Sequence, residues 1–229
     1  MDGGIRAGGT KLLPFKSLLG DFNTIYRYKH KLLLLIILMI KVRLMFLCRI
    51  INFMHNVGVF LSAQELPETY TQPALELVEL LAQNNLTFVY GGCDKGLMKL
   101  AADVTREHKG KIIAICAEQF KSHFRSDFDE QFICPDILTC KKLLINKSDA
   151  IVVLPGGTGT IDEVSDAIEH KKLGLFLGPI IFLNTNNFWD GLISQYHKIE
   201  TEKFINRPMS ELFSVVNTPQ EVIEILLKG

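Results

Sequence analysis

The feature that most restricts the fold of this 229-residue chain is a glycine-rich turn between a buried strand and a helix. Residues 150–154 (AIVVL) form a short apolar run, residues 155–159 (PGGTG) hold three glycines, and helical periodicity follows from Thr160 to Leu173. Three glycines within four positions let the backbone turn sharply and present its N–H groups without side chains in the way. A plain strand-to-helix connection needs only one glycine, so we interpret this turn as an anion site.

The rest of the chain repeats the same strand and helix alternation. Short runs rich in Val, Ile and Phe occupy residues 57–61, 86–90, 111–116 and 179–183. Helical periodicity covers residues 68–84 and 97–107, and a last helix is expected at 220–227, after Thr218-Pro219. This alternation is typical of βαβ units with strands buried on both faces. We predict an α/β fold over residues 54–229: a doubly wound, Rossmann-like parallel sheet in three layers.

A phosphate bound at the turn would meet backbone donors and the positive end of the following helix together. The candidate binding residues are therefore Gly156, Gly157, Thr158, Gly159 and Thr160. Asp162 and Glu163 are expected in the first turn of that helix, where the dipole favours negative charge. We favour the interpretation that Asp162 interacts with the helix dipole or makes a minor contact with the ligand.

A second glycine turn follows the strand at 86–90. Residues 90–98 read YGGCDKGLM and lead into the helix at 97–107. Because the carboxyl ends of parallel strands lie on one edge of a sheet, this turn and the first are expected to converge on one ligand. The alternative is a turn that serves packing alone.

Charge and cysteine content restrict the class of protein. The formal net charge is zero, but residues 1–53 hold nine Lys/Arg and two Asp/Glu, which leaves 16 and 23 for the remainder. An acidic body argues against nucleic-acid binding, which needs a broad cationic face. The five cysteines show no C-x-x-C pairing or zinc-site spacing, so we expect no metal and a reducing, cytoplasmic location.

Residues 1–53 are predicted to be an N-terminal extension, and three interpretations of it remain open. The apolar run Leu32–Ile40 is nine residues long, short of the roughly 20 that span a bilayer, and basic residues flank it. The segment is an upstream extension with Met54 as the natural first residue, a membrane-surface or anchor segment, or a structural helix of the domain. Membrane contact is expected only through residues 29–53.

These motifs resemble those of a known family. The sequence LPGGTGTIDEV (154–164) looks like the P-G-G-x-G-T-x-x-E signature of the Lonely Guy, or lysine-decarboxylase-like, family. The segment VYGGCDKGLM (89–98) resembles the V-Y-G-G-G-x-x-G-L-M-G segment of that family, and the likeness runs from Asn56 to about Glu202.

The resemblance implies an activity and a set of site residues. Family members are similar to phosphoribohydrolases that cut the N-glycosidic bond of an adenine-type nucleoside 5′-monophosphate. By the resemblance Glu163 is the catalytic carboxylate, a role that suits stabilisation of an oxocarbenium-like transition state. It further implies a purine nucleoside monophosphate as ligand, a homodimer, and no metal or redox cofactor. The nucleotide-binding set then also includes Gly91, Gly92, Met98, Cys140, Lys141 and Asp162.

The chain departs from the family pattern at three positions. The family arginine falls on Cys140, followed by Lys141, and a thiol does not replace a forked guanidinium. Cys93 and Lys99 replace glycines, and their side chains are expected to narrow the crevice or to alter which base fits. A nucleophilic role for Cys140 would need an adjacent base, and none is identifiable. The alternative function is a non-catalytic nucleotide carrier, similar to the molybdenum-cofactor carriers that share a P-G-G-x-G-T loop.

Overall fold

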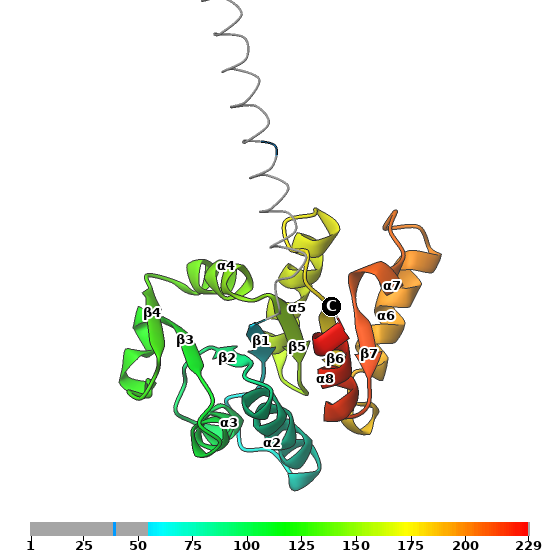
Figure 1. Cartoon of the computed structure of the whole chain (residues 1–229). Helices are drawn as coiled ribbons and strands as arrows, with labels where there is room; N and C mark the ends of the chain where they lie inside the picture. The colour runs from blue at the N-terminus through cyan, green and yellow to red at the C-terminus, as the bar shows by residue number, and fades with distance from the viewer. Residues whose placement is uncertain (1–38, 40–54, 229) are drawn as a thin grey trace, which may run out of the picture. The chain divides into compact units, whose positions relative to one another are not determined.

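The protein folds around one parallel β-sheet, as the computed structural model shows (Figure 1). The structure describes Met39 and residues 55–228, and residues 55–228 belong to one compact unit. Within the described part, seven strands pair in the order β4-β3-β2-β1-β5-β6-β7, and every pair is parallel. The strands are β1 (Asn56–Phe60), β2 (Thr87–Tyr90), β3 (Ile112–Ala117), β4 (Glu130–Cys134), β5 (Ala150–Val153), β6 (Ile180–Leu183) and β7 (Ser214–Val216).

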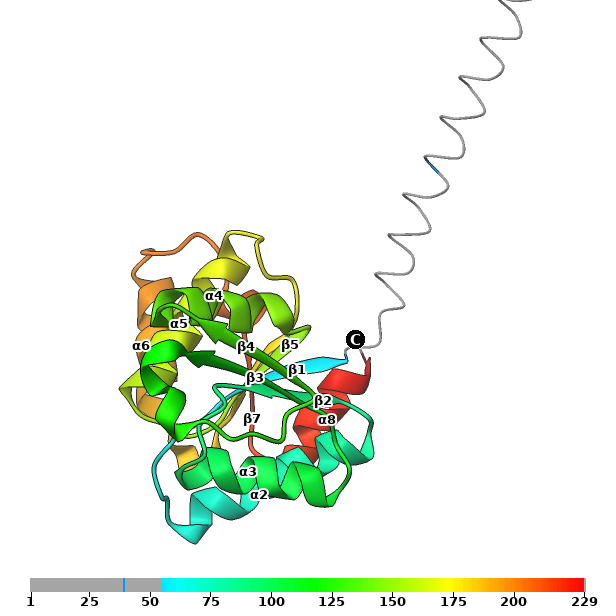
Figure 2. The same cartoon turned by 90° about the vertical axis from the view of Figure 1, so that its left-hand side faces the viewer.

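Helices connect the strands and cover both faces of the sheet (Figure 2). The α-helices are α2 (Glu68–Gln83), α3 (Gly96–Glu107), α4 (Ile137–Lys147), α5 (Thr158–Lys172), α6 (Asp190–Thr201), α7 (Met209–Leu212) and α8 (Pro219–Lys228). Two short 3₁₀ helices follow β3 and β6: η2 (Glu118–His123) and η3 (Thr185–Asn187). The predicted doubly wound, three-layer α/β fold is confirmed.

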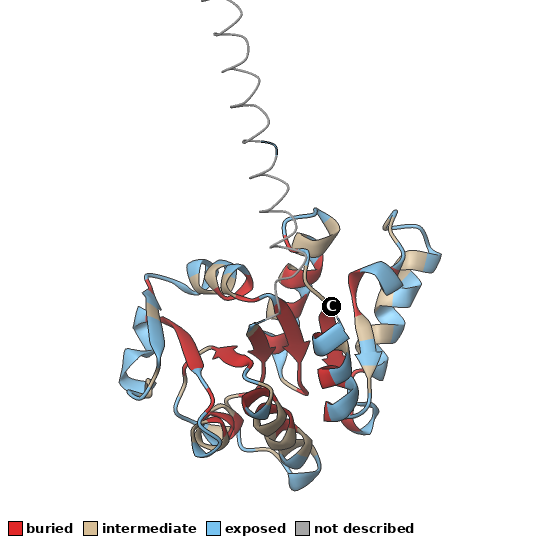
Figure 3. Cartoon of the chain, in the orientation of Figure 1, coloured by how far each residue is buried: buried red, intermediate tan, exposed pale blue. Residues whose placement is uncertain are grey.

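Side-chain alternation along the strands creates two cores, one on each face of the sheet. On one face, Val57 and Val59 of β1 pack with the apolar stripes of α2, α3 and α8. On the other, Phe60 of β1 and Ile151 of β5 pack with α4, α5 and the α6–α7 segment. Figure 3 shows the buried strands enclosed by helices whose outer surfaces are exposed. Burial on both faces explains why these strands read as continuous apolar runs.

The five strands and four helices predicted from the sequence are present, with ends shifted by one or two residues. The expected start of α8 is also found, since Pro219 is its first residue. The Thr218 N–H donates to Glu221 Oε2 at 2.9 Å. In return, the Glu221 N–H donates to Thr218 Oγ1 at 3.3 Å. This reciprocal pair is a capping box.

The sequence analysis missed β4, β7, α4, α6 and α7. The two missed strands lie at the edges of the sheet, where one side is exposed, so neither forms a continuous apolar run. No residue of α6 is fully buried and only two of α4 are, which weakens their helical apolar pattern.

The predicted start of α5 was also wrong. The helix begins at Thr158, directly after Gly157, and not at Thr160. Asp162 and Glu163 therefore lie in the second turn, and no acidic residue stands in the first turn. The first-turn dipole role expected for both residues does not apply, because the dipole effect falls off within one turn.

The expected N-terminal extension, residues 1–53, lies outside the described residues apart from Met39. Within the part of the chain that the structure describes, no helix is long and apolar enough to cross a bilayer.

Candidate functional site

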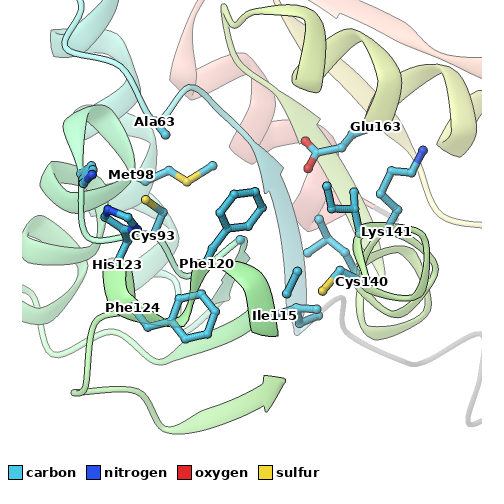
Figure 4. A pocket seen from close by; sticks show the side chains of 15 residues that line it. Ala63, Cys93, Met98, Ile115, Phe120, His123, Phe124, Cys140, Lys141 and Glu163 are labelled. Atoms are coloured by element: carbon cyan, nitrogen blue, oxygen red, sulfur yellow. The ribbon is translucent and has the colours of Figure 1, made fainter. Parts of the chain in front are cut away.

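A pocket of about 420 Å³ opens at the carboxyl ends of β1, β2 and β3. One wall comes from the β2–α3 turn and η2, and the opposite wall comes from α4 and α5 (Figure 4). The strand order reverses between β1 and β5, so the loops after these strands diverge, and ligands of open α/β sheets bind at such a point. Five residues predicted for the site line this pocket: Gly91, Met98, Cys140, Lys141 and Glu163.

The Glu163 carboxyl group points into the pocket from α5 (Figure 4). The facing wall carries Met98, Phe120 and Phe124, so few polar groups surround the carboxyl group. Burial raises the pKa of Glu163 from 4.5 to about 7, the neighbouring Asp162 adds to the rise, and Lys141 opposes it. Such a shifted carboxyl group in a cleft is typical of an acid–base or electrostatic catalytic group.

Lys141 and Asp162 form an ion pair on the rim of the pocket. Lys141 Nζ donates to Asp162 Oδ1 at 3.0 Å and to Oδ2 at 2.9 Å, and the Lys141 ammonium points away from the middle of the pocket (Figure 4). The positive charge of Lys141 is therefore already paired with the Asp162 carboxylate. Asp162 itself is exposed and does not line the pocket.

Cys140 is a residue of α4, and it forms part of the pocket wall (Figure 4). Burial and the adjacent Cys134 thiol raise its pKa well above the usual range. Cys140 therefore stays a neutral thiol near neutral pH and is a poor nucleophile.

The loop before α5 exposes bare main chain. A side chain at Gly156 would overlap the Thr160 side chain, since an added Cβ would lie 2.2 Å from Thr160 Oγ1, and Thr160 is buried. Gly157 and Gly159, in contrast, have no atom within 4 Å of an added Cβ, and no side chain caps α5. The fold therefore needs Gly156, whereas Gly157, Thr158 and Gly159 form an open surface at a helix N-terminus.

The second glycine turn serves both packing and the pocket. Gly92 has a φ of +70°, and an added Cβ would lie 2.2 Å from Cys116 Sγ, so this glycine is structural. A Cβ added at Gly91 would meet the Met98 methyl group at an ordinary distance of 3.6 Å, so packing does not require this glycine, and Gly91 lines the pocket. Cys93 also lines the pocket, as expected for a residue that narrows the crevice.

Lys99 does not narrow the crevice, contrary to expectation. Its Nζ binds Asp103 Oδ2 at 2.6 Å along α3, and the residue is not part of the pocket lining. One helical turn brings residues i and i+4 together, which directs this side chain along the helix surface.

The sequence analysis missed much of the pocket lining. Ala117 is the last residue of β3, and Phe120, His123 and Phe124 follow it. Their position at the carboxyl end of a strand could have identified them. The other missed residues are Ala63, Lys95, Ile115, Ile137 and Leu144.

Neither an arginine nor a metal cluster occupies the described site. The three arginines in the described residues are Arg106, Arg125 and Arg207, and none lines the pocket. Arg125, the nearest in sequence to Phe124, is held by the carboxylates of Asp103 and Asp127. Residues 55–228 contain no group of three or more His, Cys, Asp or Glu side chains placed to hold a metal ion.

Fold and pocket together define a Rossmann-like α/β protein with an acidic group in a cleft at the carboxyl edge of its sheet. The family model described as "Possible lysine decarboxylase" matches residues 98–226, which is more than half of the chain. The chain belongs to this family, the Lonely Guy family.

Relatives with named activities share much of the chain. It is 27% identical over 161 residues to a cytokinin riboside 5′-monophosphate phosphoribohydrolase of Arabidopsis thaliana, covering 69% of this chain and 71% of the relative. It is 30% identical over 139 residues to the enzyme of that name from Rhodococcoides fascians, covering 59% of this chain and 70% of the relative.

Solved structures share the fold. The molybdenum cofactor binding protein of Rippkaea orientalis superposes with a TM-score of 0.58, covering 76% of this chain and 95% of that protein. At 22% identity this similarity shows the fold alone.

Glu163→Gln should stabilise the protein at high pH. The folded state keeps a proton on Glu163 up to about pH 7, whereas the unfolded chain loses it near pH 4.5, so ionisation costs stability as the pH rises through this window. We expect the gain from Glu163→Gln in urea unfolding to be small at pH 4 and to reach about 3 kcal/mol at pH 8. The matched control is Glu169→Gln on the exposed side of α5, which should change stability little at either pH. A stability gain that does not change with pH would contradict the raised pKa of Glu163.

Proposed function

We propose that the protein is a nucleoside 5′-monophosphate phosphoribohydrolase that cleaves the N-glycosidic bond of an adenine-type, cytokinin-like nucleotide. Water adds to C1′ of the ribose, and the base leaves with a proton, giving free base and ribose 5-phosphate. The observation that carries this proposal is the Glu163 carboxyl group, with a pKa near 7, facing a largely apolar pocket beside a bare helix N-terminus. The names of the relatives point to the same reaction.

The 5′-phosphate would bind at the start of α5. The N–H groups of Thr158, Gly159 and Thr160 belong to the first turn, where no intrahelical acceptor exists, and the helix dipole favours an anion. The open surfaces of Gly157 and Gly159 let a phosphate approach the main chain closely. The two exposed glycines thus have a role in ligand binding that packing does not require.

Glu163 would act on the ribose. It stands one turn beyond Thr160, so a nucleotide whose phosphate lies on the first turn brings its ribose towards this carboxyl group. Loss of the base develops positive charge on the sugar, and an ionised carboxylate stabilises that charge and orients water. The apolar walls strengthen this interaction because they lower the local dielectric constant.

The remaining volume suits a purine base. Met98, Phe120 and Phe124 provide the apolar surface of the wall opposite Glu163 (Figure 4), and Gly91 permits close approach. Lys141 and Asp162 would lie at the entrance as a pair, with Asp162 setting the orientation of the lysine. Gly92 and Gly156 would support the two turns from beneath.

The second candidate function is a non-catalytic nucleotide or molybdenum-cofactor carrier. Cys140 favours it, because the pocket then lacks the forked donor that the family arginine supplies, and Lys141 is already paired with Asp162. We also propose a homodimer in the cytoplasm that needs no metal or redox cofactor and does not bind nucleic acid. These last proposals depend on the family resemblance and on the acidic composition of residues 54–229.

Purified protein should release free base from adenosine or N6-substituted adenosine 5′-monophosphates, measured by chromatography. Glu163→Gln should lower kcat/KM by at least about 100-fold, because the charge on the sugar loses its counterpart. The wild-type kcat/KM should rise as the pH increases through about 7 and then level off, since the carboxylate is the active form. The control is calorimetry on Glu163→Gln, which should show that this variant still binds the nucleotide. Tight binding by the wild type without turnover would instead support the carrier.

Gly159→Ala should weaken nucleotide binding without harming the fold. An added methyl group meets no protein atom within 4 Å and favours the helix, yet it would stand where the phosphate approaches. We expect KM to rise at least tenfold with an unchanged or higher Tm. Gly191→Ala is the matched control: Gly191 is also the second residue of a helix and also has free space around it. Equal KM values for the two variants would show that the phosphate does not bind at this surface.

Cys140→Arg should increase turnover several-fold, because it places a guanidinium on the pocket wall that carries Glu163. Cys140→Ala is the control for simple loss of the thiol, and it should leave the rate near that of the wild type. Base release would be followed for both variants at equal protein concentration. A rate for Cys140→Arg at or below that of Cys140→Ala would show that this position does not correspond to the family arginine.

A further inference from the structure

One aromatic ring on the pocket wall belongs to neither core of the fold. Phe120 is a residue of η2, just after β3, and it lines the pocket while remaining 48% exposed. Within residues 55–228 no other aromatic ring packs against it. Figure 4 shows the ring on the wall opposite Glu163, directed into the pocket. Packing of the protein therefore leaves the faces of this ring unused.

Most of the larger apolar side chains around the pocket do have a packing role. Met98 and Phe124 are half-buried and pack against the core on the α2 side of the sheet. Ile115 and Leu144 are members of the core on the α5 side. Phe120 differs from them because the pocket is its main surrounding. Aromatic side chains that remain open on a pocket wall are a usual contact surface for a ligand.

The segment that carries Phe120 is fixed against the β2–α3 turn by its backbone. Phe124 forms an isolated antiparallel bridge with Cys93. The Asp94 N–H donates to the His123 carbonyl group at 2.8 Å. The end of η2 is thus attached to the glycine turn that forms the rest of this wall.

Arg125 holds the same segment through its side chain. Its guanidinium group binds the carboxylates of Asp103, on α3, and Asp127, and its side chain is only 14% exposed. This contact holds the pKa of Asp127 below its usual range, as expected for a carboxylate that donors surround. The position of the Phe120 segment is therefore set before a ligand arrives, which lowers the entropy cost of binding.

The nucleotide of the proposed function would bring its base to this ring. With the phosphate on the first turn of α5 and the ribose beside Glu163, the base extends towards the opposite wall, where Phe120 lies. The wall from α4 provides Ile137 and Leu144 as a second apolar surface. Proteins commonly hold a flat base between aromatic and apolar side chains.

We propose that Phe120 determines which ligands the pocket accepts, by stacking on the face of the nucleotide base. The inference rests on the proposed function, and it holds whether the nucleotide is cleaved or only carried. Stacking uses the face of a base and leaves its edge free, so adenosine and N6-substituted adenosine 5′-monophosphates should gain equally. Ribose 5-phosphate, which has no flat ring, should gain nothing.

Calorimetry with two ligands separates the contribution of the base from that of the phosphate. The ligands are adenosine 5′-monophosphate and ribose 5-phosphate, and every variant also carries Glu163→Gln so that the nucleotide is not consumed. Phe120→Ala should lower the affinity for the nucleotide about 5- to 100-fold, the range expected for loss of a base–aromatic stack. Its affinity for ribose 5-phosphate should not change. Phe120→Tyr keeps a ring and should bind both ligands like the Glu163→Gln protein.

The matched control for the loss of an exposed ring is Phe204→Ala. Phe204 follows α6, is 84% exposed and does not line the pocket. Its removal should leave both affinities unchanged.

The other outcomes separate this inference from the proposed function. Equal losses for both ligands in Phe120→Ala would mean that the ring supports the pocket as a whole, and no loss for either would mean that the base lies elsewhere. Either result would overturn the proposal while nucleotide binding itself stands. A chain that binds no nucleotide, with or without Glu163→Gln, would overturn the proposed function and this inference with it.

A tryptophan reporter tests the same contact without a change at Glu163. The natural Trp189 is 2% exposed, so a tryptophan introduced by Phe120→Trp reports on the pocket. In stopped-flow mixing, adenosine 5′-monophosphate should quench its emission before the first turnover, and ribose 5-phosphate should not. Phe204→Trp should respond to neither ligand. Equal quenching of Phe120→Trp by both ligands, or none by a saturating nucleotide, would overturn the proposal.

Discussion

The position of β1 between β2 and β5 is the constraint on which the rest of the structure depends. The chain builds one half of the sheet outward from β1 to β4 and then returns to pair β5 on the other side of β1. The loops that follow β1 and β5 must therefore separate, and a crevice opens at the carboxyl edge of the sheet. The pocket, the glycine-rich turn and the start of α5 all lie at that edge. The described chain begins at the opposite, amino edge, where His55 and Asn56 bind Asp149.

The pocket places a carboxyl group where folding alone would not favour it. Glu163 faces Met98 and two phenylalanines, and its raised pKa records the cost of holding charge there. Carboxyl groups that destabilise the fold when ionised are common in active sites, where stability and activity make opposite demands. A glycine in the first turn of α5 shows a similar relation in the backbone. Gly159 lowers helix stability relative to alanine and has no packing reason to be small.

The chain belongs to the Lonely Guy family, and of the three positions at which it departs from the family pattern, Cys140 is the one that changes the chemistry expected of the pocket. Cys140 leaves the wall beside Glu163 without a guanidinium, and Lys141 is held at the rim by Asp162. The open main chain at the start of α5 and the acidic group are both present. If the proposed function holds, nucleotide binding depends on this substitution less than turnover does. The named phosphoribohydrolases are similar in sequence, whereas the cofactor-binding protein shares the fold alone.

The sequence by itself determined the parallel α/β architecture, because strands buried on both faces must be continuous apolar runs, and it identified the two glycine turns with Glu163. It did not reveal the edge strands β4 and β7 or the weakly buried α4 and α6, whose apolar patterns are short or broken. Only the tertiary structure decided which groups meet. The pKa of Glu163 depends on walls from the β2–α3 turn, β3 and α4, which are distant from it in sequence. Distances between such groups follow from the packing of whole elements, which local sequence patterns do not encode.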